Sequence, residues 1–383
     1  MVINMCEYNN VPKIRFKGFT DVWEQRKLED ITQIVMGQSP DSINYTENSD
    51  DTVLIQGNAD LNNGIVVPRI WSSQITKKSY PNDIIFTVRA PVGEIARNPY
   101  FATIGRGVAS FKGNDFLYQS LIQKKENNYW NNISAGSTFD SINSDQLKNV
   151  IIDLPKNNLE QEKIGELFTN LDNLITLHQR KCDTLVNAKK SLLEKMFPKN
   201  SSNIPEIRFK EFTDVWEQRK LGDECFELIA GGDIDKTRSV NNGKYPIYAN
   251  ALTNDGIVGY YNDSYRVKSP AVTITGRGEI GYAMARNTDF TPVVRLISLR
   301  SKHNNYFLAN AINLLNVVSE STGVPQLTIP QVEKFDIYFP KNINEEIKLG
   351  RLFNEIDNLI TLHQRKLEKL KNIKKSMLDK MFV

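Results

Sequence analysis

The sequence of 383 residues has only three cysteines, three histidines and no long uncharged apolar run. Cys6, Cys182 and Cys225 form an odd and scattered set, which fits neither a disulfide framework nor a cysteine-rich metal site. A membrane helix needs about 20 apolar residues in succession, and no basic-then-apolar leader is seen. We therefore expect a cytoplasmic protein with reduced cysteines, no bound metal and no membrane contact.

The chain also lacks a strong excess of charge of one sign, with a net charge of +3 and a pI of about 8.5. Lys and Arg number 10 against 13 Asp and Glu over residues 30–155, and 11 against 12 over 222–340. The counts are 8 against 6 over 156–199 and 10 against 6 over 341–383. Bulk charge therefore does not predict a nucleic-acid partner, and any cationic surface in the two acidic segments must be local.

Signatures of catalysis are missing as well. The sequence has no phosphate-binding loop, no C-x-x-C pair, no H-E-x-x-H and no nucleophile elbow with a histidine to serve it. Gly276, Gly278 and Gly281 spell G-x-G-x-x-G, but the following YAMARN alternates as a strand does, so we predict a β-hairpin turn. Asn98-Pro99-Tyr100-Phe101 lacks the second proline of the adenine methyltransferase motif. These absences predict a chain without catalysis or a cofactor of its own.

What the sequence does contain is an internal repeat. Residues 11–28 read VPKIRFKGFTDVWEQRKL and residues 204–221 read IPEIRFKEFTDVWEQRKL, an offset of 193. Residues 167–181 and 352–366 match at an offset of 185, and so do KKSLLEKMF (189–197) and KKSMLDKMF (374–382). The sequence between these blocks diverges almost completely. A repeated frame with two divergent inserts predicts one assembly geometry that carries two different surfaces.

The second repeated block predicts two long helices. Each spans roughly 40 residues, or about 60 Å at 1.5 Å per residue. Apolar residues and one histidine in each helix recur three and four apart, as in a coiled-coil seam. The predicted core residues are Ile164, Leu167, Leu171, Leu174, His178, Leu185 and Leu192, and Leu349, Leu352, Ile356, Leu359, His363, Leu370, Ile373 and Met377. Duplication about a pseudo-two-fold axis favours an antiparallel pair, and a parallel homodimeric zipper is the alternative.

Two features of these helices need an explanation of their own. His178 and His363 occupy equivalent positions, and we interpret them as a buried polar pair that sets the register rather than as a metal site or a base. Further apolar residues widen the stripe beyond a two-helix seam: Phe168, Ile175 and Leu193, with Phe353, Ile360 and Leu378. We expect either the globular domains or a partner protein to pack on this wider stripe.

The divergent inserts predict α+β domains. Short β-branched and aromatic runs such as IIFTVRAPVG and AVTITGRGEIGYAMA are separated by turns, and helices are expected near 117–125 and 306–315. Both inserts end on strand-like segments, at 149–155 and 334–340. The predicted fold is two similar mixed α/β domains joined by two antiparallel helices. The predicted segments are 1–155, 156–200, 201–340 and 341–383.

The whole arrangement resembles the specificity subunit of type I restriction-modification systems. The resemblance rests on the paired FTDVWEQRKL segments (19–28 and 212–221), the paired helices ending KKSLLEKMF and KKSMLDKMF, and the turn-rich inserts, including 245–261 and the glycine turns at Gly93 and Gly278. It implies two target recognition domains that each read half of a bipartite, asymmetric site in double-stranded DNA. The helices would act as the ruler between the halves.

The resemblance also implies partners. Two methyltransferase subunits would dock on the repeated regions, restriction subunits would join them, and S-adenosylmethionine, ATP and magnesium would belong to those partners. Within the recognition domains, arginine suits guanine, asparagine and glutamine suit adenine, and lysine or backbone amides suit phosphate. The predicted DNA-contacting residues are Gln56, Asn58, Lys77, Lys78, Arg89, Arg97, Arg106, Gly136, Ser137 and Thr138 in the first domain, and Lys244, Asn250, Arg277, Arg286, Arg295, Thr322 and Gly323 in the second.

Two other functions remain open at the level of sequence. The chain would be an enzyme if it fused a methyltransferase to its own recognition domains, but no cofactor loop supports this. It would be a coiled-coil adaptor without a nucleic-acid role, but that leaves the divergence of the two inserts unexplained. Binding of S-adenosylmethionine by the isolated chain would support the first alternative. A gel shift of DNA in the presence of a methyltransferase partner would contradict the second.

Overall fold

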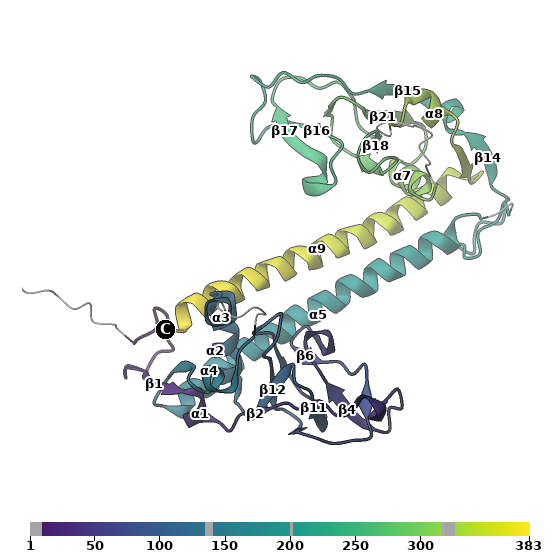
Figure 1. Cartoon of the computed structure of the whole chain (residues 1–383). Coiled ribbons are helices and arrows are strands. Elements are labelled where there is room, and N and C mark those ends of the chain that lie inside the picture. Colours follow the sequence, from purple (N-terminus) through teal and green to yellow (C-terminus); the bar gives the residue numbers. More distant parts are fainter. Residues whose placement is uncertain (1–9, 135–140, 200–201, 316, 318–325) are drawn as a thin grey trace, which may run out of the picture. The chain divides into compact units, whose positions relative to one another are not determined.

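The computed structural model describes residues 10–134, 141–199, 202–315, 317 and 326–383 (Figure 1). The chain forms two compact units. Unit 1 comprises residues 1–178 and 366–383, and unit 2 comprises residues 179–365. Among the described residues, no helix is both long enough and apolar enough to cross a membrane. The division into four segments remains a prediction from the sequence. The two units do not correspond to it, because their boundaries fall within the two long helices.

Two helices of 39 residues, α5 (Asn158–Met196) and α9 (Ile343–Met381), are each shared by both units. In unit 1 the Lys374 ammonium near the end of α9 lies 2.6 Å from a carboxylate oxygen of Asp172, near the start of α5. In unit 2 Lys189 of α5 lies 2.7 Å from Asp357 of α9. The start of one helix therefore lies beside the end of the other in each unit. This confirms the predicted antiparallel arrangement.

The predicted seam alternates between two rows of residues on each helix, and only one of these rows lies in the observed seam. Leu174 and Leu359 are 44% and 45% exposed, and Ile373 is 36% exposed, so these three are not core residues. The positions that recur three and four apart and are all buried or half-buried are instead 164, 168, 171, 175, 178, 182, 185, 189, 192 and 196 in α5, and 349, 353, 356, 360, 363, 367, 370, 374, 377 and 381 in α9.

The row that is buried contains Phe168, Ile175, Phe353 and Ile360, which the sequence showed only as a widening of the apolar stripe, and one lysine in each helix. Lys189 and Lys374 lie in it, with their aliphatic stems partly covered and their ammonium groups paired with Asp357 and Asp172. In the first half of each helix both this row and the neighbouring row of Leu167 and Leu352 are apolar, so residue type does not by itself tell which row is buried. Leu167 and Leu352 of that row are half-buried all the same, because they pack on the cores of the globular domains.

The globular domain of unit 1 is built from two main sheets. The larger has the order β2 (Val35–Met36), β12 (Val108–Phe111), β9 (Ile84–Thr87), β10 (Ile95–Arg97), β6 (Ile65–Val66), β5 (Leu61–Asn62). The other has the order β3 (Tyr45–Thr46), β7 (Trp71–Ser72), β4 (Thr52–Ile55), β11 (Ala102–Ile104), β8 (Lys78–Ser79). Val53, Ile85 and Ile104 belong to the apolar cluster that joins the two sheets. Helices α2 (Asp115–Glu126), α3 (Tyr129–Ser134) and α4 (Ser144–Lys148) complete the domain.

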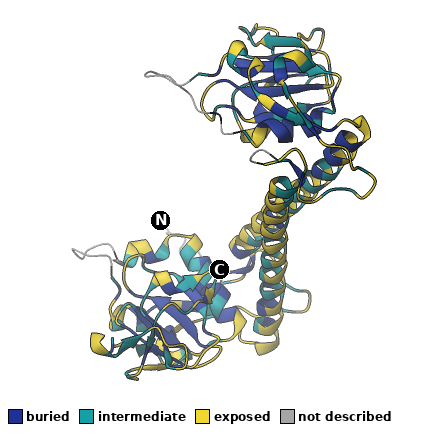
Figure 2. Ribbon diagram, turned by 90° about the vertical axis from the view of Figure 1, so that its right-hand side faces the viewer, coloured by how far each residue is buried: buried dark blue, intermediate teal, exposed yellow. Residues whose placement is uncertain are grey.

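The globular domain of unit 2 repeats this plan. One sheet has the order β15 (Cys225–Ala230), β21 (Leu296–Ser301), β18 (Ala271–Thr275), β19 (Ala283–Arg286), and the other has the order β17 (Ile257–Tyr261), β16 (Tyr245–Tyr248), β20 (Thr291–Pro292). Helix α7 (Asn305–Asn313) follows β21 as α2 follows β12, and α8 (Ile329–Glu333) precedes the last strand. Buried residues gather inside each globular domain (Figure 2). The prediction of one α+β fold in both inserts, with helices near 117–125 and 306–315, is confirmed.

The repeated opening segment joins each domain to the helices. Its EQRK residues form β1 (Glu24–Lys27) and β14 (Glu217–Lys220), followed by the short helices α1 (Leu28–Ile31) and α6 (Leu221–Glu224). β1 pairs antiparallel with β13 (Ile151–Leu154), and β14 with β22 (Asp336–Phe339), so each domain begins and ends on one two-stranded ribbon. The tryptophan before each ribbon is buried.

A buried ion pair fastens the same segment to the first turn of each long helix. The Arg15 guanidinium donates to both carboxylate oxygens of Glu160, at 2.5 and 2.8 Å, and Arg208 does the same to Glu345, both at 2.7 Å. The amide of Ile14 donates to the Lys380 carbonyl of α9, and the amide of Ile207 donates to the Lys195 carbonyl of α5. Each segment thus binds the end of one long helix and the start of the other.

Candidate nucleic-acid interface

Five loops meet at one end of the sheets in the domain of unit 1. Backbone hydrogen bonds bring them together: Gly105 N donates to Ile55 O at 2.8 Å, and Val88 N donates to Gly107 O at 2.9 Å. Thr103 Oγ1 donates to Lys77 O at 3.2 Å. We call residues 37–39, 56–58, 76–78, 88–89 and 105–107 the first loop cluster.

Glycine is required where these loops cross. A Cβ atom on Gly37 would lie 2.0 Å from the Gly105 carbonyl oxygen, and one on Gly107 would lie 2.1 Å from the Gln56 carbonyl oxygen. Backbone therefore packs on backbone, which leaves no room for side chains inside the cluster. The side chains of the intervening residues must project away from the crossing.

The first loop cluster carries four exposed cationic side chains, Lys77, Lys78, Arg89 and Arg106. Within the described part of the chain, none of the four forms an ion pair with a carboxylate. Free cations of this kind are the groups that contact phosphate and guanine. The slightly acidic domain therefore has the local cationic surface that DNA binding requires.

Asp60, which follows the 56–58 loop, has its hydrogen-bond partners within the domain. Buried Asp60 accepts hydrogen bonds from the amides of Gln56 at 2.7 Å and Gly57 at 3.1 Å, and from Arg69 Nε at 2.9 Å. The Gln56 side-chain amide donates to the Tyr45 hydroxyl at 2.8 Å. These bonds hold the 56–58 loop in place, and Asn58 lies exposed within it.

A second loop cluster occupies the equivalent end of the sheets in unit 2. It comprises residues 231–233, 249–251, 276–278 and 293–295. Gly276 N donates to Asn250 Oδ1 and Val293 N to Tyr248 O, both at 2.8 Å. The Tyr248–Val293 bond repeats the bond between Ile55 and Gly105. Asn250, Arg277 and Arg295 of the predicted set therefore come together, and Arg295 donates to Gln326.

Three predicted residues lie elsewhere. Arg97 is at the opposite end of the β9–β10 hairpin, where its guanidinium pairs with Asp115 at 2.7 Å and donates to the Gly113 carbonyl. Arg286 is only 5% exposed, lies over the Tyr248 ring at 3.6 Å, and burial lowers its pKa. Lys244 is exposed but lies at the far end of β16 from Asn250.

The structure therefore does not bring Arg97 and Arg286 together with the loop clusters, and their contact with DNA stays a prediction. Arg97 is bonded to Asp115 and to the Gly113 carbonyl near the start of α2, and Arg286 is buried over the Tyr248 ring. The predicted residues Gly136, Ser137, Thr138, Thr322 and Gly323 lie outside the described residues. Among the described residues, no group of three or more His, Cys, Asp or Glu side chains is placed to hold a metal ion.

Two residues that hold the loops of the clusters in place, Arg266 and Tyr45, were not predicted from the sequence. Arg266 Nη2 donates to the Asp233 carbonyl at 2.8 Å and holds the 231–233 loop, and Tyr45 supports Gln56 as described above. No local motif marks either residue, since each acts through a loop distant in sequence. The glycine motif at 276–281 is the predicted hairpin turn between β18 and β19. Asn98 of N-P-Y-F is buried and its side-chain amide bonds the Tyr100 carbonyl, so this segment is a turn.

Both long helices also expose leucines at repeated positions. Leu174 and Leu177 of α5 correspond to Leu359 and Leu362 of α9 at the offset of 185, and all four are more than 40% exposed. Four exposed leucines on two amphipathic helices are more than scattered surface residues, because they recur in pairs on the repeated frame. They provide two similar apolar surfaces.

Comparison with known proteins identifies the family. The type I restriction modification DNA specificity domain matches twice, over residues 20–187 and 213–372. The chain belongs to this family. Among its relatives, the type I restriction enzyme MjaIX specificity subunit of Methanocaldococcus jannaschii is 24% identical, with 94% of this chain and 92% of that protein aligned.

Other relatives are matched over about half their length. The putative type I restriction enzyme MjaX specificity subunit of Methanocaldococcus jannaschii is 29% identical over 49% of this chain and 45% of that protein. A putative type I specificity subunit of Mycoplasma pneumoniae is 26% identical over 47% of this chain and 48% of that protein. The crystal structure of the S subunit of a type I restriction-modification system from M. genitalium has the same fold, with a TM-score of 0.71, 17% identity, and coverage of 97% of this chain and 99% of that one.

Proposed function

We propose that this member of the specificity family is the non-catalytic DNA-recognition subunit of a type I restriction-modification complex. The observation that carries the proposal is the occurrence of equivalent loop clusters in both domains with different side chains on each. The first presents Gln56, Asn58 and Arg106, and the second presents Asn250, Arg277 and Arg295. Two such surfaces on one chain read two different half-sites of a bipartite, asymmetric DNA sequence.

The long helices set the distance between the half-sites. Major-groove segments on one face of B-DNA recur about every 34 Å, so two reading surfaces need a rigid spacer. Helices paired by ion pairs and an apolar seam in each unit supply that rigidity. The number of residues in the helices then determines the number of base pairs between the half-sites.

Identical partners dock on the repeated frame. The Leu174/Leu177 and Leu359/Leu362 surfaces have the same residues in the same order, which suits two copies of one methyltransferase subunit. Restriction subunits join that assembly, S-adenosylmethionine, ATP and magnesium are bound by the partners, and the complex works in the cytoplasm. Methylation-sensitive sequencing of DNA from cells that carry this chain and its methyltransferase tests the proposal. Methylation at sites without a common bipartite sequence would contradict it.

Exchange of one insert tests the assignment of half-sites. Replacing residues 222–340 with the corresponding insert of another family member should change one half of the methylated sequence and leave the other half and the spacer unchanged. The reason is that β14, the Arg208–Glu345 ion pair and the long helices lie outside the insert. Sequencing of methylated sites measures this outcome, and a change in both halves would show that the domains do not read independently.

Single substitutions in the loop clusters test the individual contacts. We expect Arg277→Ala to lower specific DNA affinity by about 1–3 kcal/mol and to relax the preference at one base pair, as loss of an arginine contact to guanine does.

Lys77→Ala should weaken binding to all sequences alike and reduce the salt slope by about one. Binding of the complex to a library of sites at several salt concentrations measures both effects.

Lys244→Ala is the matched control for Arg277→Ala. It removes an exposed cation from the same domain, at the opposite end of β16 from the second loop cluster. Affinity and base preference should be unchanged in this variant. If Lys244→Ala were as damaging as Arg277→Ala, the DNA-reading surface would have to lie elsewhere on the domain.

A further inference from the structure

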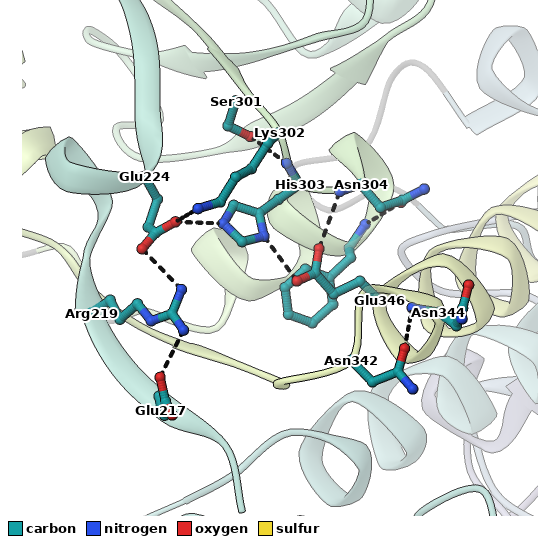
Figure 3. A network of polar contacts seen from close by, with 11 residues as sticks. Glu217, Arg219, Glu224, Ser301, Lys302, His303, Asn304, Asn342, Asn344 and Glu346 are labelled. Carbon is teal, nitrogen blue, oxygen red and sulfur yellow. Dashed lines mark hydrogen bonds and ion pairs between the residues drawn. The ribbon is translucent and has the colours of Figure 1, made fainter. Parts of the chain in front are cut away.

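A buried histidine links three elements of unit 2 (Figure 3). His303 follows β21 and is 9% exposed. Its Nε2 atom lies 2.8 Å from a carboxylate oxygen of Glu224, at the end of α6, and its Nδ1 atom lies 2.8 Å from a carboxylate oxygen of Glu346, in the first turn of α9. The ring also packs on Phe339 of β22, with 4.2 Å between ring centroids.

Two carboxylate neighbours determine the protonation of this ring. A neutral imidazole donates from one nitrogen only, so the other nitrogen would turn a lone pair toward a carboxylate oxygen. An imidazolium donates to both. Burial lowers the pKa of His303, but the hydrogen bonds to Glu346 and Glu224 outweigh it, and the net shift is upward from 6.5.

Other charged groups around the ring favour the ionised carboxylates. Lys302 lies 3.0 Å and Arg219 of β14 lies 3.1 Å from oxygens of Glu224, and Arg219 also pairs with Glu217. Burial raises the pKa of Glu224, yet hydrogen bonds from His303, Lys302 and Arg219 bring it down to about 2. Glu346 also accepts a hydrogen bond from the backbone amide of Asn304. Both acids are thus placed to hold a positively charged ring.

The equivalent place in unit 1 lacks this linkage. Asn114 and Asn304 each cap the helix after the corresponding strand, so Gly113 corresponds to His303. The repeat offsets pair Ile31 with Glu224 and Gln161 with Glu346. A cavity of about 600 Å³ occupies this place, and Ile31, Gly113 and Gln161 line it. At this place Asn114 donates a hydrogen bond of 3.0 Å to Gln161 of α5.

We propose that protonated His303 is a pH-sensitive latch that holds the recognition domain of unit 2 to the start of α9, and that unit 1 has no such latch. It joins a loop of the domain, the end of α6 and the first turn of α9 through one ring. Loss of the proton replaces one attraction with a repulsion and weakens the junction. The regulatory consequence, a change in how the second half-site is read, rests on the proposed function.

The direction of the pH effect follows from linkage. The folded state binds the His303 proton more tightly than the unfolded state, whose pKa is near 6.5. Stability from the latch is therefore complete below about pH 6.5 and is lost as the pH rises through the higher folded-state pKa. Unit 2 should become easier to unfold in alkaline solution, and unit 1 should not show this contribution.

Two measurements on the full chain test the latch without DNA. In histidine NMR spectra, which contain only three histidine signals, His303 should titrate above pH 6.5, and Glu346→Gln should lower that midpoint. Thermal unfolding from pH 6 to pH 9 should show a fall in midpoint of several degrees for the unit 2 transition. His303→Gln should remove most of that fall and lower the midpoint mainly at pH 6.

The matched control is Gln161→Asn in unit 1, which perturbs the equivalent helix turn where no histidine is present and should leave the pH dependence as it is. If His303→Gln fails to fold, the Glu346→Gln variant provides the same test, since glutamine is the residue of unit 1 at this position. A His303 midpoint at or below 6.5, or the same pH dependence with and without His303 and Glu346, would overturn the latch. Either result would leave the DNA-recognition proposal untouched.

Discussion

Glu345→Ala should destabilise unit 2 by about 3–5 kcal/mol, because it leaves the Arg208 guanidinium buried without its partner. Arg208 is 11% exposed and Glu345 is 1% exposed, and two hydrogen bonds of 2.7 Å join them. A charge in such a place cannot regain water without opening the junction between the repeated segment and the first turn of α9. Chemical denaturation followed by circular dichroism measures the loss as a lower midpoint.

Two further variants sharpen that experiment. Lys348→Ala removes the exposed ion pair between Lys348, on the next turn of α9, and Glu211 of the repeated segment, and it should destabilise unit 2 far less, because an exposed pair is screened by water. Replacing both members, as Arg208→Met with Glu345→Leu, should recover much of the loss, because no unpaired charge remains. A Glu345→Ala effect no larger than that of Lys348→Ala would show that the buried pair does not hold the junction.

The second large effect concerns the spacer. Inserting one heptad into each long helix, after Arg180 and after Arg365, should add about three base pairs between the half-sites. Seven residues lengthen a helix by about 10.5 Å, and base pairs of B-DNA rise about 3.4 Å each. The insertion points follow identical LITLHQR segments, so the seam keeps its register in both helices.

Sequencing of methylated sites gives the readout, and both half-sites should keep their sequences. Insertion of a heptad into α5 alone is the control. It makes the two helices unequal in length, and it should abolish site-specific methylation rather than lengthen the spacer. An unchanged spacer with both insertions in place would show that the helices do not measure the distance on DNA.

The internal repeat explains why so much of the architecture was predictable. A contact in one unit has a counterpart at an offset of 193 or 185, as with Arg15–Glu160 and Arg208–Glu345, or Asp172–Lys374 and Asp357–Lys189. The family, the paired helices, the α+β inserts and the hairpin at Gly276 all followed from patterns within short windows. Such patterns report periodicity and turn chemistry, which are local properties of the chain.

The loop clusters were predictable only in part. Arginine and amide residues in turns were natural candidates for DNA contact, and the structure places Arg106 and Arg277 exposed in the two loop clusters. In the sequence, Arg97 and Arg286 look like equally good candidates. In the structure, each lies at the end of its hairpin that is opposite the turn, away from the loop cluster. The contacts that hold them, with Asp115 and with the Tyr248 ring, come from other elements of the domain, which residue types alone do not encode.

By itself, the sequence determined the duplicated plan, the fold class of the inserts, the helical nature of the frame and the family. The tertiary structure decided which row of each helix is buried, because both rows are apolar in the first half of each helix and only the packing of the other helix and of the domain cores distinguishes them. It also decided that His303 is a buried link between two acids, while Gly113 leaves a cavity at the equivalent place. In each case the deciding group acts on residues distant in sequence, and burial, charge pairing and hydrogen bonding come into being only when the chain folds.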